Sequence, residues 1–104
     1  MIYEERCYTL QPAHFRRFLA VFEAEGLDMI LEHLGQLVGY FATETGTLNT
    51  VVHIWAYEDL ADREQRRNAL WNDPRWQAYA EKVMPWIVHM ESRLLKPTRF
   101  SPLQ

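Results

Sequence analysis

The sequence predicts an α+β domain in which helices cover one face of a four-stranded antiparallel sheet. Segments rich in β-branched and aromatic residues alternate with segments of helical periodicity in the order β-α-β-β-α-β. Glycine and proline stand mainly between these segments. The stretch 50–57 carries no charged residue on either face of a strand, so we expect it to be a central strand covered on both sides.

The first half of the chain predicts a strand, a helix and a second strand. Residues 2–10 alternate loosely, which places Arg6 and Tyr8 on one face of a strand. Pro12 suits the first turn of a helix, and apolar side chains at positions 15, 18, 19 and 22 follow helical spacing. Gly26 predicts a kink, and Gly35 ends the helix. Residues 36–45 form the second strand, and a short turn at 45–49 leads into the stretch 50–57.

The second half predicts a helix in two pieces and a last strand. Asp59 is the expected N-cap of a helix over residues 60–71. Asp73 and Pro74 repeat this start signal, and Pro85 ends or kinks the second piece near residue 84. A strand at 89–95 is followed by residues 96–104, whose two prolines predict an extended tail with Phe100 and Leu103 as anchors.

This order of elements is the ferredoxin-like arrangement, in which strands one and three lie at the centre of the sheet. Helices cover one face of such a sheet, and the other face here carries too many aromatic residues to be left in water. A second copy of the sheet would cover it, so we expect a homodimer.

Composition limits the function classes. With 104 residues the chain forms a single domain over 1–104, and its net charge of -3 provides no basic field for nucleic acid. No apolar run approaches the roughly 20 residues that span a bilayer. A single cysteine fits a reducing compartment, and the acidic start differs from a signal peptide. We therefore expect a cytoplasmic protein with no membrane span.

Four segments resemble the NIPSNAP family, namely residues 3–12 (YEERCYTLQP), 52–57 (VHIWAY), 63–67 (REQRR) and 96–103 (KPTRFSPL). The resemblance covers essentially the whole chain, with Ala13 standing where the family often has glycine. It implies a dimeric α/β barrel, in which two ferredoxin-like sheets close around a shared axis. It does not imply an activity, because the biochemistry of the family is poorly defined.

More distant groups that use this barrel include cofactor-free antibiotic-biosynthesis monooxygenases and haem-degrading monooxygenases, whose ligands lie between the sheet and the helices. By resemblance to the haem-degrading group, Arg6 stands in the place of an asparagine and Trp71 matches a tryptophan. The place of the axial histidine falls near Tyr79 or Ala80. Two of these three positions depart, so haem breakdown is not implied and we expect no cofactor.

The strongest candidate for a site is the face of the stretch 50–57 that carries His53, Trp55 and Tyr57. In an enzyme, His53 would act as a general base near neutral pH, while Arg6 and Tyr8 would hold an oxyanion. Alternatively, these rings are core or dimer-interface residues. Arg6 could clamp a substrate carboxylate, or it could form a structural ion pair with one of two glutamates. The two candidate partners are Glu4 and Glu91.

Further rings surround the break between the two pieces of the second helix. Trp71, Trp76 and Tyr79, together with Phe22, could grip a flat apolar ligand, or they could form a packed hydrophobic cluster. The arginines at 63, 66 and 67 share one side of the helix, which could form an anion site, although the nearby Asp62 and Glu64 favour a solvated face. Neither the four histidines nor Cys7 has metal-ligand spacing, so we expect no metal site.

Two functions therefore remain open. One is a small dimeric enzyme, such as a cofactor-free oxygenase or isomerase, that acts on an apolar or aromatic molecule. The other is a non-catalytic homodimeric binding or assembly module. An enclosed cavity of about 300 Å³ or more beside His53 would favour the enzyme, while tightly packed rings would favour the module.

Overall fold

A computed structural model describes all residues from 1 to 104. Four strands form one antiparallel sheet in the order β2-β3-β1-β4. The strands are β1 (Ile2–Leu10), β2 (Gln36–Ala42), β3 (Thr50–Tyr57) and β4 (Ile87–Leu95). The α+β, ferredoxin-like prediction is thus confirmed, with strands one and three at the centre. The stretch 50–57 forms β3 with the bounds that its composition predicts.

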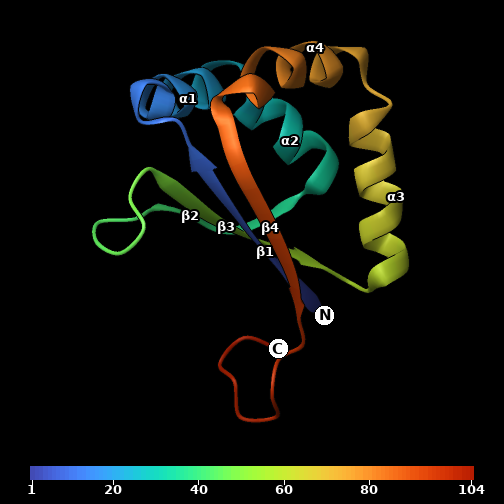
Figure 1. The fold of residues 1–104 in the computed structure, drawn as a ribbon. Coiled ribbons are helices and arrows are strands. Elements are labelled where there is room, and N and C mark those ends of the chain that lie inside the picture. The colour runs from blue at the N-terminus through green and yellow to red at the C-terminus, as the bar shows by residue number, and fades with distance from the viewer.

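Four helices lie on one side of this sheet (Figure 1). They are α1 (Phe15–Val21), α2 (Leu27–Leu34), α3 (Leu60–Trp71) and α4 (Pro74–Val83). Both predicted N-caps are confirmed: the Asp59 side chain accepts from the backbone N–H of Asp62, and the Asp73 side chain accepts from that of Arg75. None of the helices is both long and apolar enough to cross a bilayer.

The kink predicted at Gly26 is a π-helical turn, Phe22–Gly26, that joins α1 to α2. A Cβ atom at position 26 would lie 2.8 Å from Cζ of Tyr79, so the ring of Tyr79 can pack this close only against a residue without a side chain.

The bounds of two strands differ from the sequence prediction. β2 ends at Ala42 rather than at residue 45, because the backbone N–H of Thr43 donates to the carbonyl of Thr50 and closes a loop over residues 43–49. β4 begins at Ile87 rather than at residue 89, because Ile87 still pairs with Leu10 of β1 after a register shift.

The tail over residues 96–104 corrects the expectation of an extended segment. The backbone N–H of Ser101 donates to the carbonyl of Thr98, which forms a turn, and the chain then comes back toward β1 (Figure 1). There the hydroxyl of Tyr3 donates to the carbonyl of Gln104 at 3.0 Å. Phe100 anchors to nothing within the chain, since it is 82% exposed.

The two faces of the sheet differ in coverage. The face under the helices, called the helix face below, carries the hydrophobic core, including Leu10, Val51 and Trp55. The other face, called the open face, has no helix over it, and its side chains include Cys7, Phe41, Val52, Ile54 and the Glu5–Arg93 ion pair. Within a single chain the open side of β3 is covered only in part, because Ala56 is buried there but Val52 and Ile54 are half-buried.

Substituting Gly35 by alanine should lower the free energy of unfolding by about 1–3 kcal/mol. Gly35 ends α2 with φ 83° and ψ -75°, a conformation that strains any residue carrying a Cβ atom. Urea denaturation measures the loss. Gly46→Ala is the comparison, because Gly46 also has positive φ but no atom lies within 4 Å of a Cβ built there. Gly46→Ala reports backbone strain alone, while a Cβ atom at position 35 would also lie 3.0 Å from Nη1 of Arg66, so a smaller loss for Gly35→Ala than for Gly46→Ala would contradict the role of Gly35 as an obligatory helix end.

Candidate functional site

A cavity of about 60 Å³ lies between the helix face of the sheet and the helices. β1, β2 and β3 supply its sheet side through Arg6, Tyr8, Tyr40, His53 and Trp55. The helices and β4 supply an apolar wall that is rich in rings and includes Phe18, Phe22, Leu70, Trp76, Tyr79, Val83 and Met90. The cavity is therefore apolar over most of its surface, with a polar corner on the sheet.

The structure brings together eight of the nine residues that the sequence proposes for a site. The eight that line the cavity are Arg6, Tyr8, Phe22, His53, Trp55, Trp71, Trp76 and Tyr79. Tyr57 is the exception. It shares a strand face with His53 and Trp55, but it lies at the end of β3, where it is almost fully buried outside the cavity lining. Tyr57 is thus a residue of the core.

His53 is enclosed by rings and is only 2% exposed. Its ring stacks on Tyr40 with 4.6 Å between centroids, and the ring of Tyr8 meets it edge-on at 4.8 Å. Burial, with the nearby positive charge of Arg6, lowers the pKa of His53 to about 3, so the imidazole is neutral at physiological pH.

The hydrogen bond from Trp55 determines which nitrogen of His53 carries the proton. The indole Nε1 donates to Nδ1 of His53 at 2.7 Å. An indole N–H can only donate, so Nδ1 must accept and the proton of the neutral ring lies on Nε2. His53 therefore has no free lone pair to act as a general base, which corrects the role expected from the sequence. It is a hydrogen-bond donor.

Arg6 and Tyr8 form the rest of the polar corner. Nε of Arg6 donates to the hydroxyl oxygen of Tyr8 at 2.8 Å, and Nη1 donates to Glu4 at 2.8 Å. The ion-pair partner of Arg6 is thus Glu4, the nearer of the two candidates. Glu91 lies opposite Cys7 on the open face of the sheet.

Glu4 is fully buried and is the centre of a charge network beside the cavity. Besides Arg6, it accepts hydrogen bonds from Arg63 at 2.8 and 3.1 Å and from the hydroxyl of Ser92 at 2.6 Å. Burial by itself would raise the pKa of this carboxyl, but the donors outweigh it and lower the pKa to about 2. Glu4 is therefore ionised, and its oxygens are already occupied.

The three arginines of α3 do not form the solvated face that the sequence suggests. Arg63 reaches Glu4, Arg66 donates to Asp62 and to the carbonyl of His33, and Arg67 lines the cavity. This side of α3 is directed toward the sheet and α2, and its three arginines are half-buried. A glutamate on a central strand was the available signal, because a buried carboxylate requires cationic partners.

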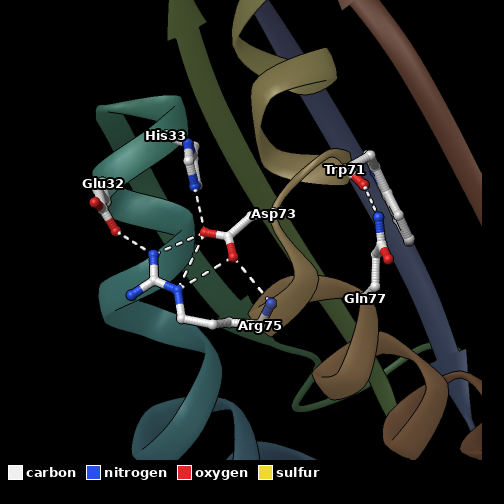
Figure 2. A network of polar contacts seen from close by, with 6 residues as sticks. All are labelled: Glu32, His33, Trp71, Asp73, Arg75 and Gln77. Atoms are coloured by element: carbon white, nitrogen blue, oxygen red, sulfur yellow. Dashed lines mark hydrogen bonds and ion pairs between the residues drawn. The ribbon is translucent and has the colours of Figure 1, made fainter.

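A second charge network connects the end of α2 to the start of α4 (Figure 2). The Asp73 carboxylate accepts from Nε2 of His33 at 2.9 Å and from Arg75, which also donates to Glu32 at 2.9 Å. Ligand atoms of Glu32, His33 and Asp73 lie within 4.8 Å of one another, as in a metal site. The guanidinium of Arg75 already bridges the carboxylates of Glu32 and Asp73, so their charges are balanced by a side chain and not by a metal ion.

Beside this network, the side chain of Gln77 donates to the carbonyl of Trp71 at 2.7 Å (Figure 2). This bond ties the last residue of α3 to α4. Trp71 lines the cavity and is 40% exposed, so it lies where the cavity meets solvent. The bond from Gln77 therefore holds the junction between α3 and α4 at the edge of the cavity.

A family model described as NIPSNAP matches residues 3–102 of the chain. The chain belongs to the NIPSNAP family. NipSnap homolog 2 of Danio rerio is 38% identical over 103 residues, which cover 99% of this chain and 35% of that protein. NipSnap homolog 2 of Mus musculus is 36% identical, with 99% and 36% covered. This NIPSNAP chain spans about a third of the length of these curated relatives.

Solved structures of NIPSNAP proteins share this fold over nearly the whole chain. A NIPSNAP family protein with unknown function from Agrobacterium tumefaciens has a TM-score of 0.96 at 45% identity, with 100% of this chain and 94% of that chain covered. A NIPSNAP-like domain protein from Burkholderia xenovorans has a TM-score of 0.93 at 48% identity, with 97% and 88% covered.

An antibiotic biosynthesis monooxygenase shares the fold at much lower similarity. Its TM-score is 0.65 at 9% identity, with 94% of this chain and 99% of that chain covered. At this identity the likeness extends to the fold alone. It supports the ferredoxin-like architecture of the NIPSNAP chain and transfers no activity to it.

Proposed function

We propose that this NIPSNAP domain binds a small apolar molecule in the cavity between its sheet and its helices. The observation that carries the proposal is a ring-lined cavity with a polar corner of three side chains, Arg6, Tyr8 and His53. Apolar walls with a few placed polar groups are typical of small-molecule sites, in which burial provides affinity and the polar groups provide orientation.

The volume of the cavity limits the ligand. About 60 Å³ is well below the roughly 300 Å³ of sites for drug-sized ligands, so the cavity as it stands accepts only a few non-hydrogen atoms. A larger molecule would extend past the rim residues Trp71, Met84 and Met90, which are all partly exposed. Methionine side chains adapt readily, so the rim can open without moving the sheet.

The lack of a free proton acceptor among the ionisable side chains of the cavity favours a binding module over the cofactor-free oxygenase or isomerase. Both reactions need a group that removes a proton from the substrate. No aspartate or glutamate lines the cavity, and the acceptor nitrogen of its one histidine, His53, is already occupied by Trp55. Binding is therefore the function that the geometry supports best.

We further propose that the domain acts as a homodimer joined through the open face. Val52 and Ile54 lie there in the middle of the central strand β3 and are only half-buried. Phe41 on β2 is 57% exposed on the same face. A second copy of this face would bury these side chains, and the Glu5–Arg93 ion pair supplies a polar rim.

A cytoplasmic location also belongs to the proposal. Cys7 is the single cysteine of the chain, and its pKa is raised by burial and by the nearby carboxylates of Glu5 and Glu91. It is thus a protonated thiol rather than a reactive thiolate, in keeping with a reducing compartment.

Filling the cavity should abolish binding while the fold is retained. Ala80 lines the cavity from α4 and is buried, whereas Ala78 is an exposed alanine of the same helix. Xenon enters small apolar cavities and is a suitable probe, with chemical shifts of nearby methyl groups as the readout. Ala80→Leu should weaken xenon binding at least tenfold, and Ala78→Leu should leave it unchanged.

Two results would contradict the proposed binding function. One is wild-type protein whose methyl groups show no saturable shift with xenon pressure. The other is equal binding by Ala80→Leu and wild type, with both retaining a cooperative unfolding transition. Either result would mean that the space beside His53 is a packing defect of the core.

A further inference from the structure

We propose that the molecule bound in this cavity carries an anionic oxygen, as a small monocarboxylate does, which accepts hydrogen bonds from His53 and Trp76. This inference rests on the proposed binding of a small apolar molecule and specifies its polar group. It follows from an imbalance among the groups that line the cavity, which contain unused donors and no unused anionic acceptor.

The first unused donor is Nε2 of His53. This atom is fully buried and has no hydrogen-bond partner in the protein. Because Trp55 donates to the other ring nitrogen, Nε2 carries the proton and can only donate. Trp55 therefore acts as a positioning residue that selects the donor form of His53.

The second unused donor is Nε1 of Trp76 on α4. It is also fully buried and without a partner, and an indole N–H never accepts. Buried donors are nearly always paired in folded proteins. Two orphaned N–H groups on side chains that line one cavity, one from the sheet and one from a helix, indicate an acceptor that is present when the site is filled.

The charged side chains around the cavity also favour an anionic ligand. Arg6 and Arg67 are the charged residues of the lining, and both are cationic. Glu4 lies next to them, but its oxygens already accept from Arg6, Arg63 and Ser92. An anion would thus find a positive field without a competing carboxylate on the wall.

The tyrosines cannot replace the missing anion. Burial raises the pKa of Tyr40 and of Tyr79 well above the usual range of a phenol, so both remain neutral. A cation would be repelled by the two arginines, and a ligand without acceptors would leave the orphaned N–H groups unpartnered. An apolar body with one oxyanion satisfies all of these groups.

Nitrogen NMR on the intact protein tests the donor form of His53 directly. With ¹⁵N-labelled histidine, His53 should appear from pH 5 to pH 8 as a neutral ring protonated at Nε2. Trp55→Phe removes the indole donor and should produce a mixture of the two neutral forms. An Nδ1-protonated ring or an imidazolium in the wild type above pH 6 would overturn the inference.

Ligand binding is tested with isobutyrate and its neutral isostere isobutyramide. Isobutyrate should bind at least tenfold more tightly than isobutyramide and should shift both the His53 Nε2 and the Trp76 Nε1 resonances. In Trp55→Phe this preference should fall toward unity. Because the neutral imidazole persists throughout, the wild-type preference should stay constant from pH 6 to pH 8.

Xenon separates failure of this inference from failure of the proposed function. If xenon binds but isobutyrate binds no better than isobutyramide, or not at all, the oxyanion is excluded and water is the partner of the two donors. If xenon does not bind either, the proposed binding function itself fails. Binding of isobutyrate that shifts neither resonance would place the anion elsewhere and would also overturn the inference.

Discussion

Glu4→Gln should lower the free energy of unfolding by about 3–5 kcal/mol in urea denaturation at pH 7. Glu4 is fully buried on the central strand β1 and neutralises Arg6 and Arg63. Glutamine keeps the shape of the side chain but removes the charge. Two guanidinium groups are then left beside the core without a counter-ion, which is the costly outcome when one partner of a buried pair is lost.

Glu5→Gln is the matched control, because it makes the same change one residue along the same strand. Glu5 faces the open side and pairs with Arg93, which is 68% exposed. Exposed ion pairs contribute little, so this variant should lose less than about 1 kcal/mol. Equal losses for the two variants would show that the Glu4 network does not stabilise the fold.

The acid dependence of stability provides a second readout of the same carboxylate. The pKa of Glu4 is about 2 in the folded protein, against 4.5 for the unperturbed group. Because the folded-state pKa is depressed, the contribution of Glu4 is complete above about pH 4.5 and is lost as the pH falls toward 2. The difference corresponds to about 3 kcal/mol. Glu4→Gln should lack this part of the pH slope.

Val52→Glu should convert a homodimer into a species of 12.4 kDa in sedimentation velocity at micromolar concentration. Val52 lies on the open face of β3, beside Cys7 of β1 and Phe41 of β2. In a two-fold interface a carboxylate at this position would be buried twice, once from each copy. Desolvation of two unpaired charges costs several kcal/mol, which exceeds what a small interface can offset.

Leu60→Glu is the control for the dimer. Leu60 is 59% exposed at the start of α3, away from the open face, and it receives the same apolar-to-acidic change. This variant should sediment like the wild type, at twice 12.4 kDa. A wild type that sediments as a stable 12.4 kDa species would refute the proposed dimer directly.

Local signals in the sequence were sufficient for most of the fold. The apolar composition of 50–57 predicts the bounds of β3, and Asp59 and Asp73 mark the starts of α3 and α4. Gly35 marks the end of α2. Each of these signals acts within a few residues of chain, through propensity, capping or a special backbone conformation, so neighbouring residues are enough to reveal it.

The sequence predicted most of the residues of the candidate site but not their chemical roles. Period-two alternation placed Arg6 and Tyr8 on one face of their strand, and His53 and Trp55 on one face of theirs. The register of β1 and β3, with Arg6 opposite His53, brings both pairs to the cavity. Alternation could not separate Tyr57 from them, because distance along the strand decides which side chains reach the cavity. It also could not show which nitrogen of His53 is free.

The sequence by itself determined the order of the elements and the central position of β3, but it predicted that the aromatic face of the sheet would lie away from the helices, whereas the rings of β3 lie under them. Only the tertiary structure decided that Glu4 meets Arg63, 59 residues away, and that Trp55 turns His53 from a potential base into a donor. Pairing and protonation depend on distances of about 3 Å and on burial. Neither is specified until the chain has folded.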